Sequence, residues 1–252
     1  MLFFSPISMA QANQIDDFSA QYQTYNQTNQ EFSLAKKVYL KNQTLAAKND
    51  LIEKSQNLLL KRSQIFHSYF LALRFKLHNT GGISAEEIDH YTDKLNQEID
   101  YLESNIQQLQ NLSDPTLDQI KAKSTDFEER QDIFQRLSYQ TLSTIEIGKI
   151  NELNQDLENI NKKFEPYIDQ STTSYLNNWY QDSQNGYVQV NQKISESKEK
   201  LDSMEKANDR RLTQVHSELN SLLEKSKIIL LKSLGFHREI INQLNQDLVK
   251  NE

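Results

Sequence analysis

One pair of residues in this chain, Glu87 and His90, has the types and spacing of metal ligands. A Glu and a His three positions apart share one face of a helix, and di-iron sites in helical bundles use such pairs. A site of that kind needs a second Glu-x-x-His pair and further carboxylates, and the sequence has no second pair. We therefore interpret Glu87 as a helix-capping residue and His90 as a surface residue, and we expect neither a metal nor a cofactor.

The other reactive residue types form no pattern that is typical of catalysis. The remaining histidines are scattered along the chain and make no HExxH or H-x-x-x-H motif; they are His67, His78, His216 and His237. The absence of cysteine excludes a thiol nucleophile, disulfides and Cys-based zinc sites. There is also no glycine-rich phosphate loop. The sequence predicts a protein that is not an enzyme.

Composition favours long helices. The hydrophobic fraction is 37%, below the ~45–50% of an average globular domain, and the mean hydropathy is −0.75. A bundle of long helices needs only one apolar stripe per helix, and no run of alternating β-branched residues indicates a strand. We predict an all-α fold, an elongated antiparallel helical bundle or coiled coil without β-sheet. The net charge of −7 argues against a nucleic-acid partner.

Glycine and proline, which usually end helices, are rare after Asn13. Their positions predict helices over about 15–78, 84–111, 115–165, 167–183 and 188–250, which together form a single domain over 13–252. Gly81-Gly82 and Pro115 mark the clearest reversals, and Ser84 with Glu87 has the pattern of a capping box. Pro166 and Gly186 mark weaker breaks, and Gly148 and Gly235 lie inside helices, where glycine is costly and indicates close contact or a kink.

Charge predicts how two of these helices pair. The first predicted helix is basic between Lys54 and His78, and the second is acidic. A turn at Gly81-Gly82 would lay them antiparallel, so we predict a helical hairpin over 54–111. The N-terminal half of the first helix would then need another partner, and the natural candidate is the last helix, either of the same chain or of another chain. Within that helix the step Met204-Asn208-Leu212 is a stutter that locally unwinds a coiled coil.

The first twelve residues resemble the end of a secretory signal peptide. Leu2 to Met9 are apolar or small, and Ala10-Gln11-Ala12 is an A-x-A cleavage pattern. A basic n-region is missing, so a hydrophobic N-terminal arm that packs on the bundle is the alternative. No stretch approaches the ~20 apolar residues that a spanning helix requires. We predict export to the periplasm, cell surface or medium, with a cytoplasmic location if 1–12 is not a signal.

Two short runs, Tyr39-Leu40-Lys41-Asn42-Gln43-Thr44-Leu45 and Tyr69-Phe70-Leu71-Ala72-Leu73-Arg74-Phe75-Lys76-Leu77, carry a resemblance. They resemble a group of unannotated exported helical proteins of candidate-phyla bacteria, over roughly the first 110 residues. The resemblance implies an exported, elongated helical protein and carries no known activity.

The residues most typical of a protein interface are Tyr175, Trp179 and Tyr180, because Trp and Tyr dominate interface hot spots. Their alternative role is a small satellite core. The apolar stretches 58–77 and 228–236 are interpreted as core, with a membrane-surface role as the alternative. We therefore predict a non-enzymatic, exported structural or interaction protein that binds a protein partner or itself. The alternatives are a membrane-active protein of the pore-forming type and a cytoplasmic coiled-coil scaffold.

Overall fold

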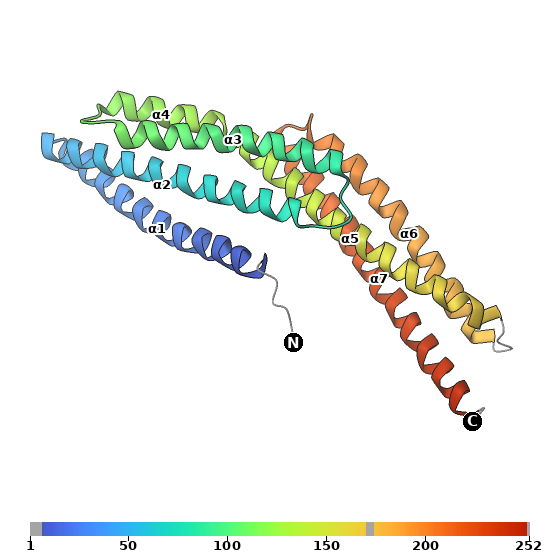
Figure 1. The fold of residues 1–252 in the computed structure, drawn as a ribbon. Coiled ribbons are helices and arrows are strands. Elements are labelled where there is room, and N and C mark those ends of the chain that lie inside the picture. Colours follow the sequence, from blue (N-terminus) through green and yellow to red (C-terminus); the bar gives the residue numbers. More distant parts are fainter. Residues whose placement is uncertain (1–6, 170–173, 251–252) are drawn as a thin grey trace. The chain divides into compact units, whose positions relative to one another are not determined.

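A computed structural model describes residues 7–169 and 174–250 of the chain, and every regular element within these ranges is an α-helix (Figure 1). The predicted all-α fold is therefore confirmed, and the helices pack together as bundles. No helix in the described ranges is long and apolar enough to cross a membrane. The helices are α1 (Ile7–Asn42), α2 (Leu45–His78), α3 (Ala85–Asn111), α4 (Leu117–Glu129), α5 (Gln131–Asp169), α6 (Ser174–Met204) and α7 (Asp209–Lys250).

The contacts between residues divide the chain into two compact units. Unit 1 holds the chain up to His78 together with Asp89–Ser138, and unit 2 holds Asn79–Ile88 together with the chain from Tyr139 onward. Each unit therefore combines two separate stretches of sequence, and both α3 and α5 contribute to the two units. The interpretation of residues 13–252 as one domain stays a prediction.

The predicted first helix, 15–78, is wrong, because the chain reverses between α1 and α2. Gln43 takes a left-handed φ of 31°, and Thr44 Oγ1 accepts a hydrogen bond from the Ala47 N–H at 3.2 Å, as an N-cap does. No Gly or Pro marks this turn, so the sequence pattern missed it. The N-terminal half pairs with α2. Within the predicted leader, residues 1–6 lie outside the described ranges, and α1 begins at Ile7.

The predicted hairpin over 54–111 is confirmed, with α2 and α3 antiparallel. Gly82 has a φ of 71° at the turn, and Ser84 and Glu87 exchange both capping-box hydrogen bonds. Four side-chain contacts fix the register: Ser63–Asn105, His67–Glu103, Arg74–Asn96 and His78–Thr92. Charge attraction between α2 and α3 is only part of the reason for this pairing. One of the basic residues of α2, Lys54, forms its ion pair with Glu31 of α1 and not with α3.

The predicted third helix, 115–165, is two helices in the structure. Asp114 has a φ of 47°, and Thr116 is the N-cap of α4, in a capping box with Gln119. Pro115 is therefore not the first helical residue. The predicted helix is interrupted at Arg130, which lies between α4 and α5. Its guanidinium donates to both carboxylate oxygens of Glu98, at 3.0 and 2.8 Å, and this contact ties the α4–α5 junction to α3.

The break predicted at Pro166 falls a few residues later, because α5 ends at Asp169 and α6 begins at Ser174. The break predicted at Gly186 is wrong, because α6 runs through this residue. Pro166 lies in the last turn of α5, so it removes a single backbone hydrogen bond. Gly186 faces Ser233 of α7 so closely that a Cβ would meet the serine hydroxyl. Helix packing, and not a turn, is the reason for this glycine.

The chain instead reverses at 205–208, so the predicted last helix, 188–250, is also wrong. α6 and α7 pack antiparallel, and Lys200 bonds Glu218 across the pair at 2.5 Å. Asn208 Oδ1 accepts a hydrogen bond from the Arg211 N–H at 3.1 Å and begins α7. The predicted stutter at Met204-Asn208-Leu212 is therefore the position of a turn.

Unit 2 is a three-helix bundle in which buried residues alternate at spacings of three and four, as heptad seams do. α7 runs antiparallel to α6 and parallel to α5. Many seam positions are polar or small, which is unusual for a core. The seams are Ile147, Ile150, Asn154, Leu157, Asn161, Phe164 and Ile168 in α5; Leu176, Tyr180, Ser183, Tyr187, Val190, Ile194, Ser197, Leu201 and Met204 in α6; and Leu223, Ser226, Leu230, Ser233, His237 and Ile240 in α7.

Candidate functional site

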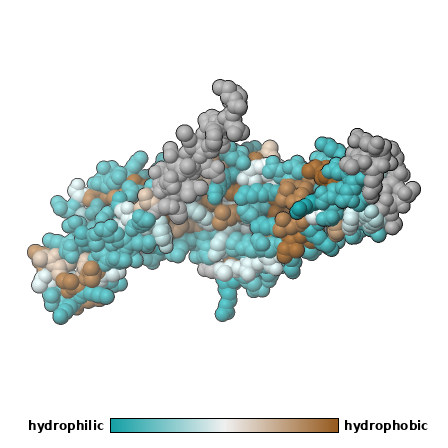
Figure 2. Space-filling model, turned by 90° about the horizontal axis from the view of Figure 1, so that it is seen from below, coloured by the Kyte–Doolittle hydropathy of each residue, from teal (hydrophilic) through white to brown (hydrophobic). Residues whose placement is uncertain are grey.

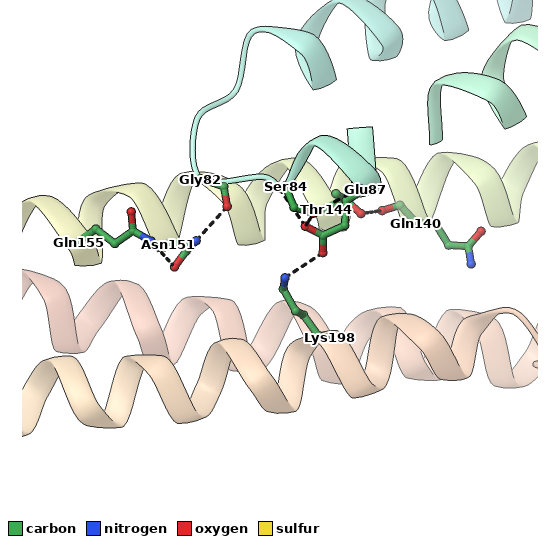
Figure 3. Close-up of polar contacts among 8 residues, drawn as sticks. All are labelled: Gly82, Ser84, Glu87, Gln140, Thr144, Asn151, Gln155 and Lys198. Atoms are coloured by element: carbon green, nitrogen blue, oxygen red, sulfur yellow. Dashed lines mark hydrogen bonds and ion pairs between the residues drawn. The ribbon is translucent and has the colours of Figure 1, made fainter. Parts of the chain in front are cut away.

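Glu87 and His90 do not converge on a common site. The Glu87 carboxylate accepts hydrogen bonds from Ser84 at the start of α3 and an ion pair from Lys198 of α6 at 2.8 Å (Figure 3). Partial burial raises the pKa of the Glu87 carboxyl, but the bonds from Lys198 and Ser84 outweigh it, so the pKa lies below its usual value. His90 is exposed and stacks edge-on against Tyr91. Glu87 is therefore a structural anchor.

The turn before Glu87 is fastened to α5. Asn151 Nδ2 donates a hydrogen bond to the Gly82 carbonyl at 2.9 Å, and Asn151 Oδ1 accepts one from Gln155 (Figure 3). Gly148 faces Gly81, Gly82 and Ile83, and a Cβ at Gly148 would collide with the Ile83 side chain. The close contact that the sequence indicated at Gly148 is thus present. The hydrogen bond from Asn151 and the close packing at Gly148 together hold the turn in place.

The histidines do not gather. His67 bonds Glu103, and His216 stacks flat on Tyr139 with ring centroids 4.0 Å apart. Within residues 7–169 and 174–250, no group of three or more His, Cys, Asp or Glu side chains could hold a metal ion. His237, by contrast, has a tyrosine hydroxyl and an asparagine amide as its neighbours.

His237 lies in the core of unit 2, with Tyr187 of α6 and Asn161 of α5. Its Nε2 is 2.5 Å from the Tyr187 hydroxyl and 3.2 Å from Asn161 Oδ1. Burial lowers the pKa of His237 and raises the pKa of Tyr187 to about 12. The three residues are only 1–3% exposed. A substrate has no access to such a cluster, so we assign it a role in helix pairing.

Tyr175, Trp179 and Tyr180, which the sequence predicts as partner contacts, lie in the first turns of α6. Tyr180 is buried, in a cluster with Phe164, Ile168, Leu176 and Ile240. Trp179 packs against this cluster, and its ring centroid is 5.1 Å from that of Tyr175, which is 42% exposed. Tyr175 and Trp179 therefore border a small core that Tyr180 helps to build.

The best-formed candidate site is a groove of about 650 Å³ in unit 1, which we call the aromatic groove. Its floor is the α2 surface, including Leu58 and Leu59, and its walls are α1 and α4. Tyr25, Phe32 and Tyr39 of α1 line one wall at intervals of seven residues, which places them on one helix face. Leu117 and Ile120 of α4 form the opposite wall. The result is an apolar trough between two helices.

Charge around the aromatic groove is mainly positive. Lys36, Arg62 and Lys121 line it, against one carboxylate, Glu128. Lys36 Nζ lies 5.9 Å from the centre of the Phe32 ring, and Arg62 lies over Phe127 at 4.5 Å. The basic rim contrasts with the net charge of −7 of the whole chain. An anionic or acidic ligand is therefore favoured at this position.

A second groove, of about 1010 Å³, lies between α6 and α7 near their turn. It is lined mainly by charged and polar side chains of both signs, and the Lys200–Glu218 pair crosses it. Such a surface is typical of a solvated seam between helices, so the smaller aromatic groove is the better candidate.

The sequence contains one wall of the aromatic groove but does not mark it as a site. Tyr25, Phe32 and Tyr39 are spaced by seven residues, which indicates one face of a helix and no more. The contribution of α4 was not visible, because the predicted helix over 115–165 did not show its separate start at Thr116. The reversal at Gln43, which brings α1 back along α2, has no Gly or Pro to mark it. No known protein family, curated protein or solved structure matches the chain.

Proposed function

We propose that this protein is a non-enzymatic interaction protein that binds an acidic amphipathic helix of a partner in the aromatic groove. The observation that carries the proposal is the groove itself: an apolar trough with aromatic side chains on one wall and a basic rim. Helix-in-groove recognition uses an apolar helix face for affinity, and charges at the rim select the partner.

The dimensions of the aromatic groove fit a short helix. From Tyr25 to Tyr39 the α1 wall covers fourteen residue-to-residue steps, which is about 21 Å at 1.5 Å per residue. A partner helix of about four turns would place apolar residues against Phe32, Leu58 and Leu117. Acidic residues on its flanks would reach Lys36 on one side and Lys121 on the other.

The A-x-A pattern at Ala10-Gln11-Ala12 supports export as the setting of this function. We propose that the protein binds its partner at the cell envelope. Determining the N-terminus of the mature protein from its native cell tests this part. A start at Asn13 supports export, and a start at Met1 contradicts it.

A set of synthetic amphipathic helical peptides tests the binding proposal. The peptides share one apolar face and differ only in acidic, neutral or basic flanks, and fluorescence anisotropy measures their affinity for the full chain. We expect the acidic peptide to bind tightest and to weaken with added salt. Equal affinity for the three peptides, or no binding, would overturn the proposal.

Charge reversal in the groove supplies the matched comparison. Lys36→Glu combined with Lys121→Glu should weaken binding of the acidic peptide at least tenfold. Lys37→Glu is the control, because Lys37 is exposed on the same helix but does not line the groove. If Lys37→Glu weakened binding as much as the double variant, the effect would be one of total charge and the groove would not be the site.

A further inference from the structure

α7 carries apolar residues on its outer surface as well as in its core seam. Ile228, Leu231, Leu234 and Ile241 are 45–68% exposed, although Leu230, Ser233, His237 and Ile240 bury the opposite side of the same segment. Figure 2 shows hydrophobic side chains gathered in a band on unit 2, among a mostly hydrophilic surface. A helix that is apolar on both sides is usually covered on both sides.

The band continues from α7 onto the neighbouring edge of α5. Glu146 of α5 and Lys227 of α7 form an ion pair at 3.5 Å across this edge, as charged residues that flank a heptad seam do. At the next heptad positions the charges are replaced by Leu153 and Ile160 on α5 and by Leu234 and Ile241 on α7. These four side chains are 39–50% exposed. We call the six residues 153, 160, 228, 231, 234 and 241 the apolar band.

Gly235 lies within this band. Two other glycines inside helices, Gly148 and Gly186, each face a close neighbour in the chain, but a methyl group at Gly235 would meet no atom of the described residues within 4 Å. An exposed glycine in a helix interior costs about 1 kcal/mol relative to alanine. Among the residues that the structure describes, none makes the close approach that would explain Gly235, and this points to a neighbour outside the chain.

We propose that the apolar band is the interface between two copies of this chain. Leu231 and Gly235 lie about one turn apart on the same face of α7. Leu231 projects a large side chain, and Gly235 leaves a gap in the surface. A twofold axis between them places Leu231 of each copy over Gly235 of the other, so the surface is complementary to itself, as a twofold interface requires. The two α7 helices then cross antiparallel, and Leu153 and Ile160 of α5 pack at the sides of the crossing.

The size of the band agrees with a dimer. Six large apolar side chains that are about half exposed offer on the order of 600 Å², and a standard interface buries ~800 Å² per partner. The band therefore supplies most of one side of such an interface.

Light scattering of the full chain over a range of concentrations tests the proposal. We expect a monomer–dimer equilibrium that Leu231→Glu shifts toward monomer by at least tenfold in dissociation constant. Val188→Glu is the control, because Val188 of α6 is 67% exposed in the same unit but lies outside the band. A wild-type chain that stays monomeric throughout, or a Val188→Glu variant that dissociates as much as Leu231→Glu, would overturn the proposal.

Disulfide cross-linking tests the antiparallel crossing of the two α7 helices. Because the sequence has no cysteine, each variant carries a single thiol. Chains with Leu231→Cys and chains with Gly235→Cys are mixed and treated with a mild oxidant. We expect the mixture to form disulfide-linked dimers faster than either variant alone, and Val188→Cys to form few. Equal rates in the mixture and in the single variants would rule out the antiparallel crossing at these two residues. Neither result depends on whether the aromatic groove binds a helix.

Discussion

Gly82 and Gly148 pack backbone against backbone, and neither position has room for a Cβ. Gly82 turns the chain between α2 and α3, and Gly148 lies in the middle of α5. The contact explains why a costly residue occupies a helix interior: any larger side chain would push the turn away from α5. The carbonyl of Gly82 is then in reach of the Asn151 amide, at 2.9 Å.

Substitution of Gly148 by alanine should destabilise the protein. Its Cβ would collide with Ile83 and with backbone at Gly81, and overpacking of this kind costs about 1–3 kcal/mol. Urea denaturation followed by circular dichroism measures the change in the free energy of unfolding. Gly235→Ala is the matched control, studied at a concentration where the chain is monomeric. Since a Cβ there meets open space, it should stabilise the helix by about 0.5–1 kcal/mol. Equal effects of the two substitutions would contradict the close contact.

The Glu87–Lys198 pair should make stability depend on pH in the acid range. The pKa of Glu87 in the folded protein lies below its ordinary value of 4.5, so its contribution is present above that pH. The contribution is lost as the pH falls through the folded-state pKa. Because the pair is partly exposed, we expect no more than ~1 kcal/mol. The difference in unfolding free energy between wild type and Glu87→Gln should therefore shrink below about pH 4.5. A difference that stays constant down to pH 3 would show that the charge of Glu87 is not involved.

Protonation of His237 should also lower stability, and the loss should begin at a higher pH than for Glu87. Burial lowers its pKa below the ordinary 6.5, so the neutral ring is favoured in the folded state. Stability is then fully present above pH 6.5 and falls as the pH drops below it, because the unfolded chain binds the proton more readily. The slope is at most ~1.4 kcal/mol per pH unit for this group. NMR titration of the His237 ring should give a midpoint below 6.5, and a midpoint at or above that value would refute the assignment.

The sequence predicted the features that rest on local chemistry. The capping box at Ser84 and Glu87, the turn at Gly81-Gly82 and the α2–α3 hairpin depend on residues close in the chain, and all three are present. The sequence failed where tertiary packing decides. Gly186 resembled a break but is a contact with Ser233. The two reversals at Gln43 and at 205–208 have no Gly or Pro, so their polar residues could not be told apart from a solvated helix face.

The same limit applies to the aromatic groove. Tyr25, Phe32 and Tyr39 were detectable as a stripe, but a groove needs two walls and a floor. The second wall, α4, begins at the Thr116 capping box, one residue after Pro115, where the sequence pattern placed the start of a helix. Since both walls are placed by turns without strong markers, only the coordinates bring them together.

Glu98 and Arg130 give the last prediction, because a nearly buried carboxylate depends on a single cation. The Glu98 side chain is 8% exposed, and Arg130 Nη1 contacts both its oxygens, at 3.0 and 2.8 Å. Arg130→Met should lower the free energy of unfolding by about 3 kcal/mol, since it leaves a buried charge without its partner. The guanidinium also lies 4.1 Å from the centre of the Tyr101 ring, so part of the loss will reflect packing. Adding Glu98→Leu to Arg130→Met removes the uncompensated charge and should recover most of the stability. Urea denaturation of wild type, both single variants and the double variant completes the cycle. If the two losses simply add, the ion pair does not hold the α4–α5 junction against α3.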